Sequence, residues 1–123
     1  MTTPGQYALN IYKGATLGGS GYTFTWKDSA GVAVNLTNYT ARLQVRASVD
    51  AATFLLELTT TLVDGSGIVL GGAAGTIELV ATAAQTAAYT WDDGVYDLEV
   101  IDSTGFVTRL LQGPAKAWHE VTR

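Results

Sequence analysis

The most regular feature of the chain is an alternation of apolar and polar residues with a period of two. In "YTFTW" the side chains of Tyr22, Phe24 and Trp26 fall on one face and threonines fall on the other. Such alternation is typical of β-strands with one buried face. The same pattern, or a shorter apolar run bounded by turn residues, occurs in segments 7–13, 39–46, 53–59, 76–79, 96–100, 106–112 and 115–122. About eight short strands at this spacing predict an antiparallel sandwich or barrel.

Three short segments with aspartate at the first position and glycine at the fourth separate candidate strands. They are "DSAG" (28–31), "DGSG" (64–67) and "DSTG" (102–105). A type I turn prefers these residues at these positions, so we expect all three to be hairpin connections. Calcium is the alternative ligand for such loops, but none has oxygen-bearing residues at alternate positions followed by glutamate at the twelfth. The sequence therefore predicts no metal site here.

The segment "TAAQTAAY" (82–89) departs from the strand pattern. Thr82 is followed three residues later by Gln85, which is the spacing of a capping box, and the alanines around them favour helix. We expect a helix of one or two turns between two strands.

The segment "TWDDGVYDLEV" (90–100) has two interpretations. Asp92, Gly94 and Tyr96 form a D-x-G-x-Y pattern at the start of a strand, which is typical of a tyrosine corner. In that reading Asp92 and Asp93 cap the turn, Gly94 supplies a permissive backbone and the Tyr96 hydroxyl bonds to upstream backbone. The alternative makes Asp92 and Asp93 an acid/base pair. Neighbouring strand residues point to opposite faces, which favours the corner.

Composition limits the class of protein. The 123 residues suffice for one domain with its own core, which we place at 1–123. Only 15% of residues are charged, against about 25% in an average globular domain, so we expect part of the surface to pack against other subunits. A net charge of −4 with 7 Lys plus Arg argues against nucleic acid as a partner.

The start of the chain, "MTTPGQYALN", has neither a basic nor an apolar signal-peptide region. We therefore expect no secretory signal, and flexible residues at 1–5. The most apolar stretch, 67–84, contains Glu78 and several glycines, so it does not resemble a membrane span and no membrane partner is expected.

Motifs for catalysis and cofactor binding are absent from the sequence. There is no cysteine, and the single histidine, His119, is not accompanied by a G-x-S-x-G nucleophile motif. Phosphate-cradling glycine motifs are also missing. We expect no enzyme activity, no cofactor and no metal. A small hydrolase that uses Asp92, Asp93 or His119 stays open as an alternative.

Candidate interface residues lie in two places. The segment 114–123 places Trp118 and His119 between charged residues, and an exposed aromatic there would suit an interface. Arg42 and Arg46 lie on the polar face of their predicted strand. They could contact a partner, or form cross-strand pairs with Asp97 and Glu99, and the second reading is favoured.

Four segments together resemble the immunoglobulin-like N-terminal domain of phage baseplate upper proteins. They are "NIYKGAT", "FTWKDSAGVAVNLTNYTARLQVR", "GIVLGGAAGTIEL" and "GVYDLEVIDSTGFVTRLLQG". The resemblance implies an immunoglobulin-like β-sandwich of about 7–9 strands with a short helix joining strands E and F. It also implies a virion component without enzymatic activity, assembled in the host bacterial cytoplasm. Its partners would be other virion proteins, met in several copies within a symmetric assembly.

The leading hypothesis is thus a phage structural protein that docks on the tail or baseplate, or links a fibre to it. A decoration protein on the capsid surface is the alternative within the virion. A carbohydrate-binding module is the alternative from another class, and it would present exposed aromatic side chains.

Overall fold

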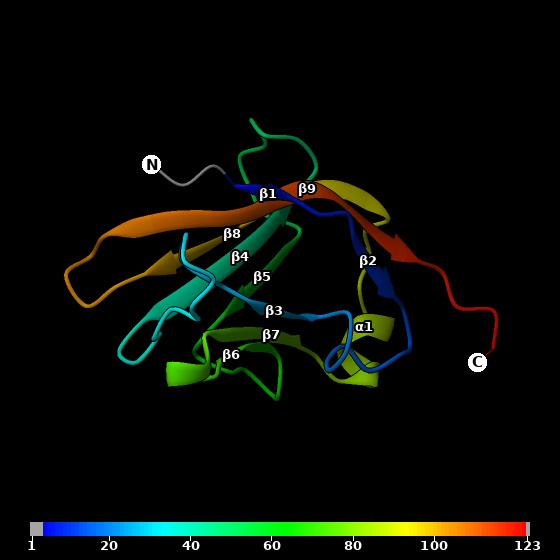
Figure 1. Cartoon of the computed structure of the whole chain (residues 1–123). Helices are drawn as coiled ribbons and strands as arrows, with labels where there is room; N and C mark the ends of the chain where they lie inside the picture. Colours follow the sequence, from blue (N-terminus) through cyan, green and yellow to red (C-terminus); the bar gives the residue numbers. More distant parts are fainter. Residues whose placement is uncertain (1–3, 123) are drawn as a thin grey trace.

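The computed structural model describes residues 4–122 as two β-sheets packed face to face (Figure 1). The larger sheet contains β1 (Gly5–Gln6), β2 (Leu9–Tyr12), β4 (Thr40–Arg46), β5 (Leu56–Thr59), β8 (Asp93–Ile101) and β9 (Val107–Trp118). The smaller sheet contains β3 (Thr23–Thr25), β6 (Gly67–Leu70) and β7 (Thr76–Val80). Two helical turns, η1 (Gly72–Ala74) and α1 (Ala83–Ala87), complete the described elements. The predicted all-β sandwich with one short α-helix is confirmed.

The order of strands in the larger sheet is β1-β9-β8-β4-β5, and β2 also pairs with β9. The smaller sheet has the order β3-β7-β6. All pairings are antiparallel except those of β1 and β2, which run parallel to β9. The first strands of the chain therefore lie beside the last one. The strand pattern in the sequence predicted an antiparallel sandwich and gave no indication of this parallel edge.

One hydrophobic core fills the space between the sheets. Its residues come from alternate positions of the strands, as the pattern predicted: Leu43 and Val45 of β4 and Leu98 and Val100 of β8 have no exposed surface. Tyr22, Phe24 and Trp26 pack against this core from the smaller sheet as half-buried side chains. Burial of this alternating apolar face gives the principal drive for the two sheets to pack together.

The C-terminal segment forms part of the larger sheet. β9 is a single 12-residue strand, and its Ala115 and Ala117 are buried. The register with β8 shifts after Leu98, so that one residue of β9, Leu110, has no partner. This β-bulge keeps Arg109 outward despite the consecutive leucines. The candidate interface segment 114–123 therefore belongs to the sheet up to Trp118, and the strand predicted at 115–122 is present as far as that residue.

The N-terminal residues are partly ordered as well. Gly5, which was expected to be flexible with the rest of 1–5, pairs with Leu111 in β1. Residues 1–3 lie outside the described part of the chain.

Residues 67–70 form β6, a strand that the alternation of apolar and polar residues did not predict. Ile68 of this strand is buried, and β6 pairs with β7 over four residues. Ile68, Val69 and Leu70 are all apolar, so this segment has no alternation with polar residues, which is why the pattern did not reveal the strand.

Two of the three predicted hairpin turns have the expected form. Asp28 and Asp102 each accept, through the backbone carbonyl, a hydrogen bond from the glycine three residues later at 3.0 Å. Each aspartate side chain also accepts two backbone N–H groups of its loop. The third turn differs: Val63 and Ser66 exchange backbone bonds around Asp64 and Gly65, both with positive φ. Those dihedral signs are typical of a type I′ turn that begins one residue earlier than predicted.

The predicted capping box is present at α1. Thr82 accepts a hydrogen bond from the Gln85 backbone, and the Gln85 side chain accepts one from the Thr82 backbone. α1 connects β7 to β8, which crosses from the smaller sheet to the larger one (Figure 1). No helix within residues 4–122 is long and apolar enough to span a bilayer.

Candidate functional site

Tyr96 is buried in the middle of the larger sheet, where its side chain crosses a neighbouring strand. Its hydroxyl donates a 2.7 Å hydrogen bond to the carbonyl of Tyr7, one of the two residues between β1 and β2. Gly113 of β9 is the register partner of Tyr96, and a Cβ on Gly113 would lie 2.5 Å from the Tyr7 carbonyl oxygen. Because Gly113 has no side chain, β9 and the Tyr7 backbone can lie close together. Burial, and to a lesser extent Tyr7, raises the pKa of Tyr96 well above 10.0.

The other two residues of the predicted corner have different roles from those expected. Gly94 is required for space: an added Cβ would lie 2.6 Å from the Arg46 carbonyl oxygen of β4. Asp92 does not cap the turn, because its carboxylate bonds Lys13 and His119 instead. The Tyr96 hydroxyl does reach upstream backbone, but 89 residues away on the N-terminal edge.

Asp92 connects two chain segments at the end of the larger sheet. Its Oδ1 lies 3.0 Å from Lys13 Nζ and 2.8 Å from His119 Nε2. Hydrogen bonds from Lys13 and then from His119 lower the pKa of Asp92. The carboxylate is therefore ionised at neutral pH and suited to an ion pair, not to proton donation.

The two adjacent carboxylates have separate partners. Asp93 lies 3.7 Å from Lys116 Nζ, whereas Asp92 contacts Lys13 and His119. Acid/base catalysis by a pair needs carboxyl groups that face one substrate with different pKa values. The arrangement of Asp92 and Asp93 is instead that of two surface ion pairs.

Two aromatic side chains lie together on the outer face of the same sheet. Tyr12 of β2 is the register partner of Trp118 of β9, and they are 54% and 44% exposed. The Trp118 indole N–H donates to Asn10 Oδ1 at 3.0 Å, and Lys116 Nζ lies 4.4 Å from the centre of the indole. We call these four residues the aromatic surface. A fixed indole loses little conformational freedom on binding, which suits an interface.

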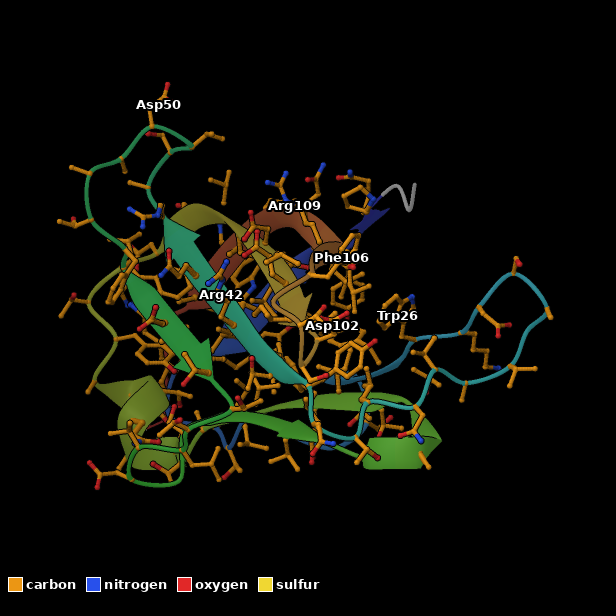
Figure 2. All side chains as sticks on the ribbon, turned by 90° about the vertical axis from the view of Figure 1, so that its left-hand side faces the viewer. Trp26, Arg42, Asp50, Asp102, Phe106 and Arg109 are labelled. Carbon is orange, nitrogen blue, oxygen red and sulfur yellow. The ribbon has the colours of Figure 1, made fainter. Side chains whose placement is uncertain are left out.

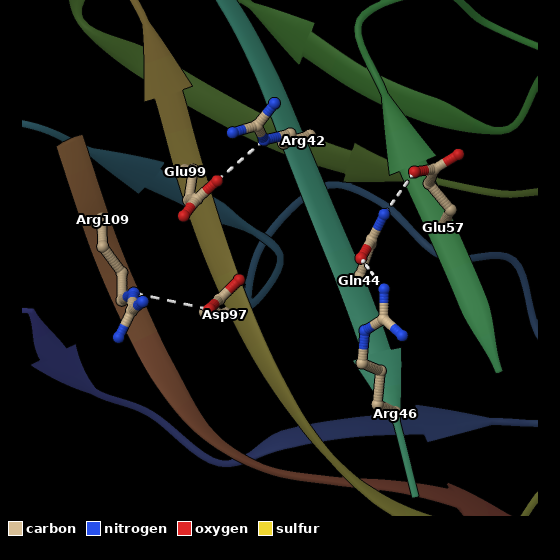
Figure 3. A network of polar contacts seen from close by, with 7 residues as sticks. All are labelled: Arg42, Gln44, Arg46, Glu57, Asp97, Glu99 and Arg109. Carbon is tan, nitrogen blue, oxygen red and sulfur yellow. Dashed lines mark hydrogen bonds and ion pairs between the residues drawn. The ribbon is translucent and has the colours of Figure 1, made fainter. Parts of the chain in front are cut away.

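A network of polar side chains covers another part of this outer face (Figure 3). Arg42 Nε lies 2.7 Å from Glu99 Oε1, and Arg109 Nε lies 3.4 Å from Asp97 Oδ2. The network continues toward β5, where Gln44 donates to Glu57 at 2.6 Å and accepts from Arg46 at 2.9 Å. Arg46 also donates to the Ala51 carbonyl.

This network lies in a groove of about 840 Å³, which we call the polar groove. Its walls include Val49 of the β4–β5 loop and Gln6 of β1. The loop, with Asp50 near its tip, rises beyond the sheet (Figure 2). Burial, and then the neighbouring Glu99, raises the pKa of Asp97, while Arg109 opposes the shift.

The structure separates the four predicted interface residues into two groups. Trp118 and His119 lie at the end of β9, near the aromatic surface and the Asp92 ion pairs. Arg42 and Arg46 line the polar groove, which has neither Trp118 nor His119 in its lining. The expected pairing of Arg42 with Glu99 is present, whereas Arg46 bonds Gln44 and backbone.

Sequence reasoning missed Tyr12 and Asn10. The alternation in "LNIY" does place both on the polar face, opposite the buried Leu9 and Ile11. What the sequence did not indicate is the parallel pairing that places Tyr12 beside Trp118. Arg109 of the polar groove was missed because its place depends on the bulge in β9.

Comparison of the chain with protein-family models and with curated proteins finds no match. Function is therefore inferred from the residues and from the geometry of these two surfaces.

Proposed function

We propose that this protein is a non-enzymatic structural component of a bacteriophage virion, where it docks on the tail or baseplate or links a fibre to it. The observation that carries an interaction role is the aromatic surface. Exposed tyrosine and tryptophan are enriched at protein interfaces, and they account for a large share of binding energy where they occur. Lys116 and Asn10 hold Trp118 in place before any partner binds.

The strand order supports an immunoglobulin-like topology. If β2, β3, β4, β5, β6, β7, β8 and β9 are taken as strands A, B, C, C′, D, E, F and G, the sheets read A-G-F-C-C′ and B-E-D. The strands G, F and C in one sheet and B, E and D in the other match that sandwich class, in which strand A usually lies beside B, and α1 would then join E to F. The Tyr96 bond differs from the usual corner because its acceptor, the Tyr7 carbonyl, lies just before strand A.

The phage assignment rests on the resemblance to baseplate upper proteins described above, and the charge-poor composition favours it. With 15% charged residues, the surface is compatible with contacts to several neighbouring subunits. In a symmetric virion many copies are held together, so a small interface suffices through multivalency.

The test uses virions of the phage that encodes this chain, prepared with its gene deleted. Purified protein is added, and the new density is located by electron microscopy. We expect density at the tail, the baseplate or the fibre junction. Density over the capsid lattice would instead identify a decoration protein, and absence of added density from the virions would overturn the virion role.

The aromatic surface is tested with the same virions by adding the Trp118→Ala variant. We expect it to fold normally, because Trp118 is half exposed, and to bind at least about tenfold more weakly, as for an interface anchor. Phe106→Ala is the matched control, since Phe106 is an exposed aromatic in the β8–β9 connection. If Phe106→Ala weakens binding and Trp118→Ala does not, docking uses a different surface. Circular dichroism checks that both variants are folded.

A further inference from the structure

The polar groove is a second surface that the docking role does not use. Its lining residues lie on the outer face of the larger sheet, between the β4–β5 loop, which Figure 2 shows with Asp50, and β1. Its volume of about 840 Å³ falls within the range of about 300–1,000 Å³ that is usual for small-molecule sites. The groove is therefore large enough to hold a small ligand.

The charges in the groove cancel. Its lining includes three arginines, Arg42, Arg46 and Arg109, and three carboxylates, Glu57, Asp97 and Glu99. An anionic ligand would approach carboxylates and a cationic ligand would approach guanidinium groups, and either would have to compete with an existing pair. The balance favours an uncharged polar ligand.

Hydrogen-bonding groups in the groove have unused capacity. A guanidinium has five N–H donors, and among the contacts of residues 4–122 Arg42 uses its Nε for Glu99. The Arg42 side chain is 50% exposed, so its terminal nitrogens are accessible. The Asp97 and Glu99 carboxylates each have lone pairs beyond those that the arginines engage.

Donors and acceptors alternate from strand to strand across the groove (Figure 3). Arg109 on β9 is followed by Asp97 and Glu99 on β8, then by Arg42 on β4 and by Glu57 on β5. Neighbouring strands are separated by about 4.8 Å. A hydroxyl group both donates and accepts, so a ligand with several hydroxyls can bond successive strands. Apolar lining residues, Val95 and Pro114 among them, can contact its carbon atoms.

We propose that the polar groove binds a neutral polyhydroxylated ligand, that is, an uncharged saccharide. Arg42 and Glu99 position its hydroxyl groups, and the β4–β5 loop forms one wall of the site. This role is independent of docking through the aromatic surface, because the two surfaces have different lining residues.

The experiment is a titration of ¹⁵N-labelled protein with four neutral hexasaccharides: cellohexaose, chitohexaose, mannohexaose and maltohexaose. We expect at least one to shift the backbone amide resonances of β4 and β8, with an affinity that does not change with salt concentration. Arg42→Ala should weaken this binding at least about tenfold. Arg42→Lys keeps the charge but removes the planar donor group, so it should weaken binding as well and serves if Arg42→Ala does not fold.

Lys27→Ala is the matched control, because Lys27 is an exposed cation outside the groove lining. It should bind as the unchanged protein does. Absence of resonance shifts with all four saccharides would overturn the proposal. So would binding that is lost in Trp118→Ala and kept in Arg42→Ala, since the ligand would then belong to the aromatic surface.

Discussion

At the scale of single residues, Tyr96 connects parts of the chain that are far apart in sequence. Its ring is buried in β8, and its hydroxyl bonds the Tyr7 carbonyl at 2.7 Å across the side-chain-free position of Gly113. The bond satisfies a carbonyl at the interruption between β1 and β2, where regular pairing with β9 is broken. A buried polar group without such a partner would destabilise the fold.

We therefore expect Tyr96→Phe to lower the free energy of unfolding by about 1 kcal/mol, since the ring stays and one hydrogen bond is lost. Urea denaturation measures the change. Tyr12→Phe is the control, because the Tyr12 side chain is 54% exposed and water can solvate its hydroxyl. Equal losses in the two variants would contradict the assigned role of the Tyr96 bond.

Three aspartates differ in pKa for reasons of local contact. The pKa values of Asp92 and Asp102 are both below 3.8. Hydrogen bonds from Lys13 and His119 lower that of Asp92, and bonds from Thr104 and the loop backbone lower that of Asp102. Burial, followed by Glu99, raises the pKa of Asp97 above 3.8. Titration of the carboxyl carbons by NMR should show this order. As the pH falls from neutral, we expect Asp97 to be protonated before Asp92 and Asp102. An Asp97 value below those of Asp92 and Asp102 would contradict it.

The signs of the resulting pH effects are opposite. Asp92 and Asp102 stabilise the fold above 3.8, and this contribution is lost as the pH falls through their lowered folded-state pKa values. Asp97 has a higher pKa in the folded state than in the unfolded state. The contribution of Asp97 to the free energy of unfolding therefore decreases as the pH rises from 3.8 through the raised pKa.

At the scale of elements, α1 is held at both ends of its single turn. The capping box of Thr82 and Gln85 satisfies its first backbone N–H groups. Thr86, which is buried, donates to the Ala15 carbonyl at 2.8 Å and accepts from the Gly14 N–H at 3.0 Å. A five-residue helix has little stability of its own, so these contacts determine where the chain crosses between sheets.

Thr82→Ala should lower the free energy of unfolding by about 1 kcal/mol, because the Gln85 N–H in the first turn of α1 loses its side-chain acceptor. Chemical denaturation measures this value. Ser29→Ala, at an exposed position of the 28–31 turn, is the comparison and should change little. A Thr82→Ala variant as stable as the Ser29→Ala variant would show that the cap contributes nothing.

At the scale of the whole molecule, one edge of the sandwich is formed by pairing of β2 with β9, which are far apart in the sequence. β2 lies along the last strand, and Leu9 and Ile11 enter the core beside Ala115 and Ala117. The first and last parts of the chain must meet before this edge forms, and such non-local pairing is typical of slowly folding β proteins.

Ile11→Ala should therefore destabilise the entire fold, by about 2–5 kcal/mol, as a cavity in the core does. Thermal and urea unfolding should each show a single cooperative transition, at a lower temperature and a lower urea concentration than for the unchanged protein. Val69→Ala is the matched control, since Val69 is 42% exposed on β6, and surface changes are usually within about 0.5 kcal/mol. If the Ile11 variant loses β2 alone while the rest unfolds as before, the edge is a separate unit.

The amino-acid sequence by itself determined the type and approximate place of most elements. Alternation identified β4, β7 and β8, the Thr82–Gln85 spacing identified α1, and aspartate and glycine identified two of the three turns. These features depend on interactions between residues close together in the chain, so the local pattern contains them.

Only the tertiary structure decided the pairing of strands and the contacts across them. The parallel edge of β2 on β9 places Tyr12 beside Trp118, and the bulge at Leu110 turns Arg109 outward into the polar groove. The Tyr96 hydroxyl likewise finds its acceptor 89 residues away. Register and edge pairing are selected by which apolar faces fill the common core, a condition on the whole chain that no short segment expresses.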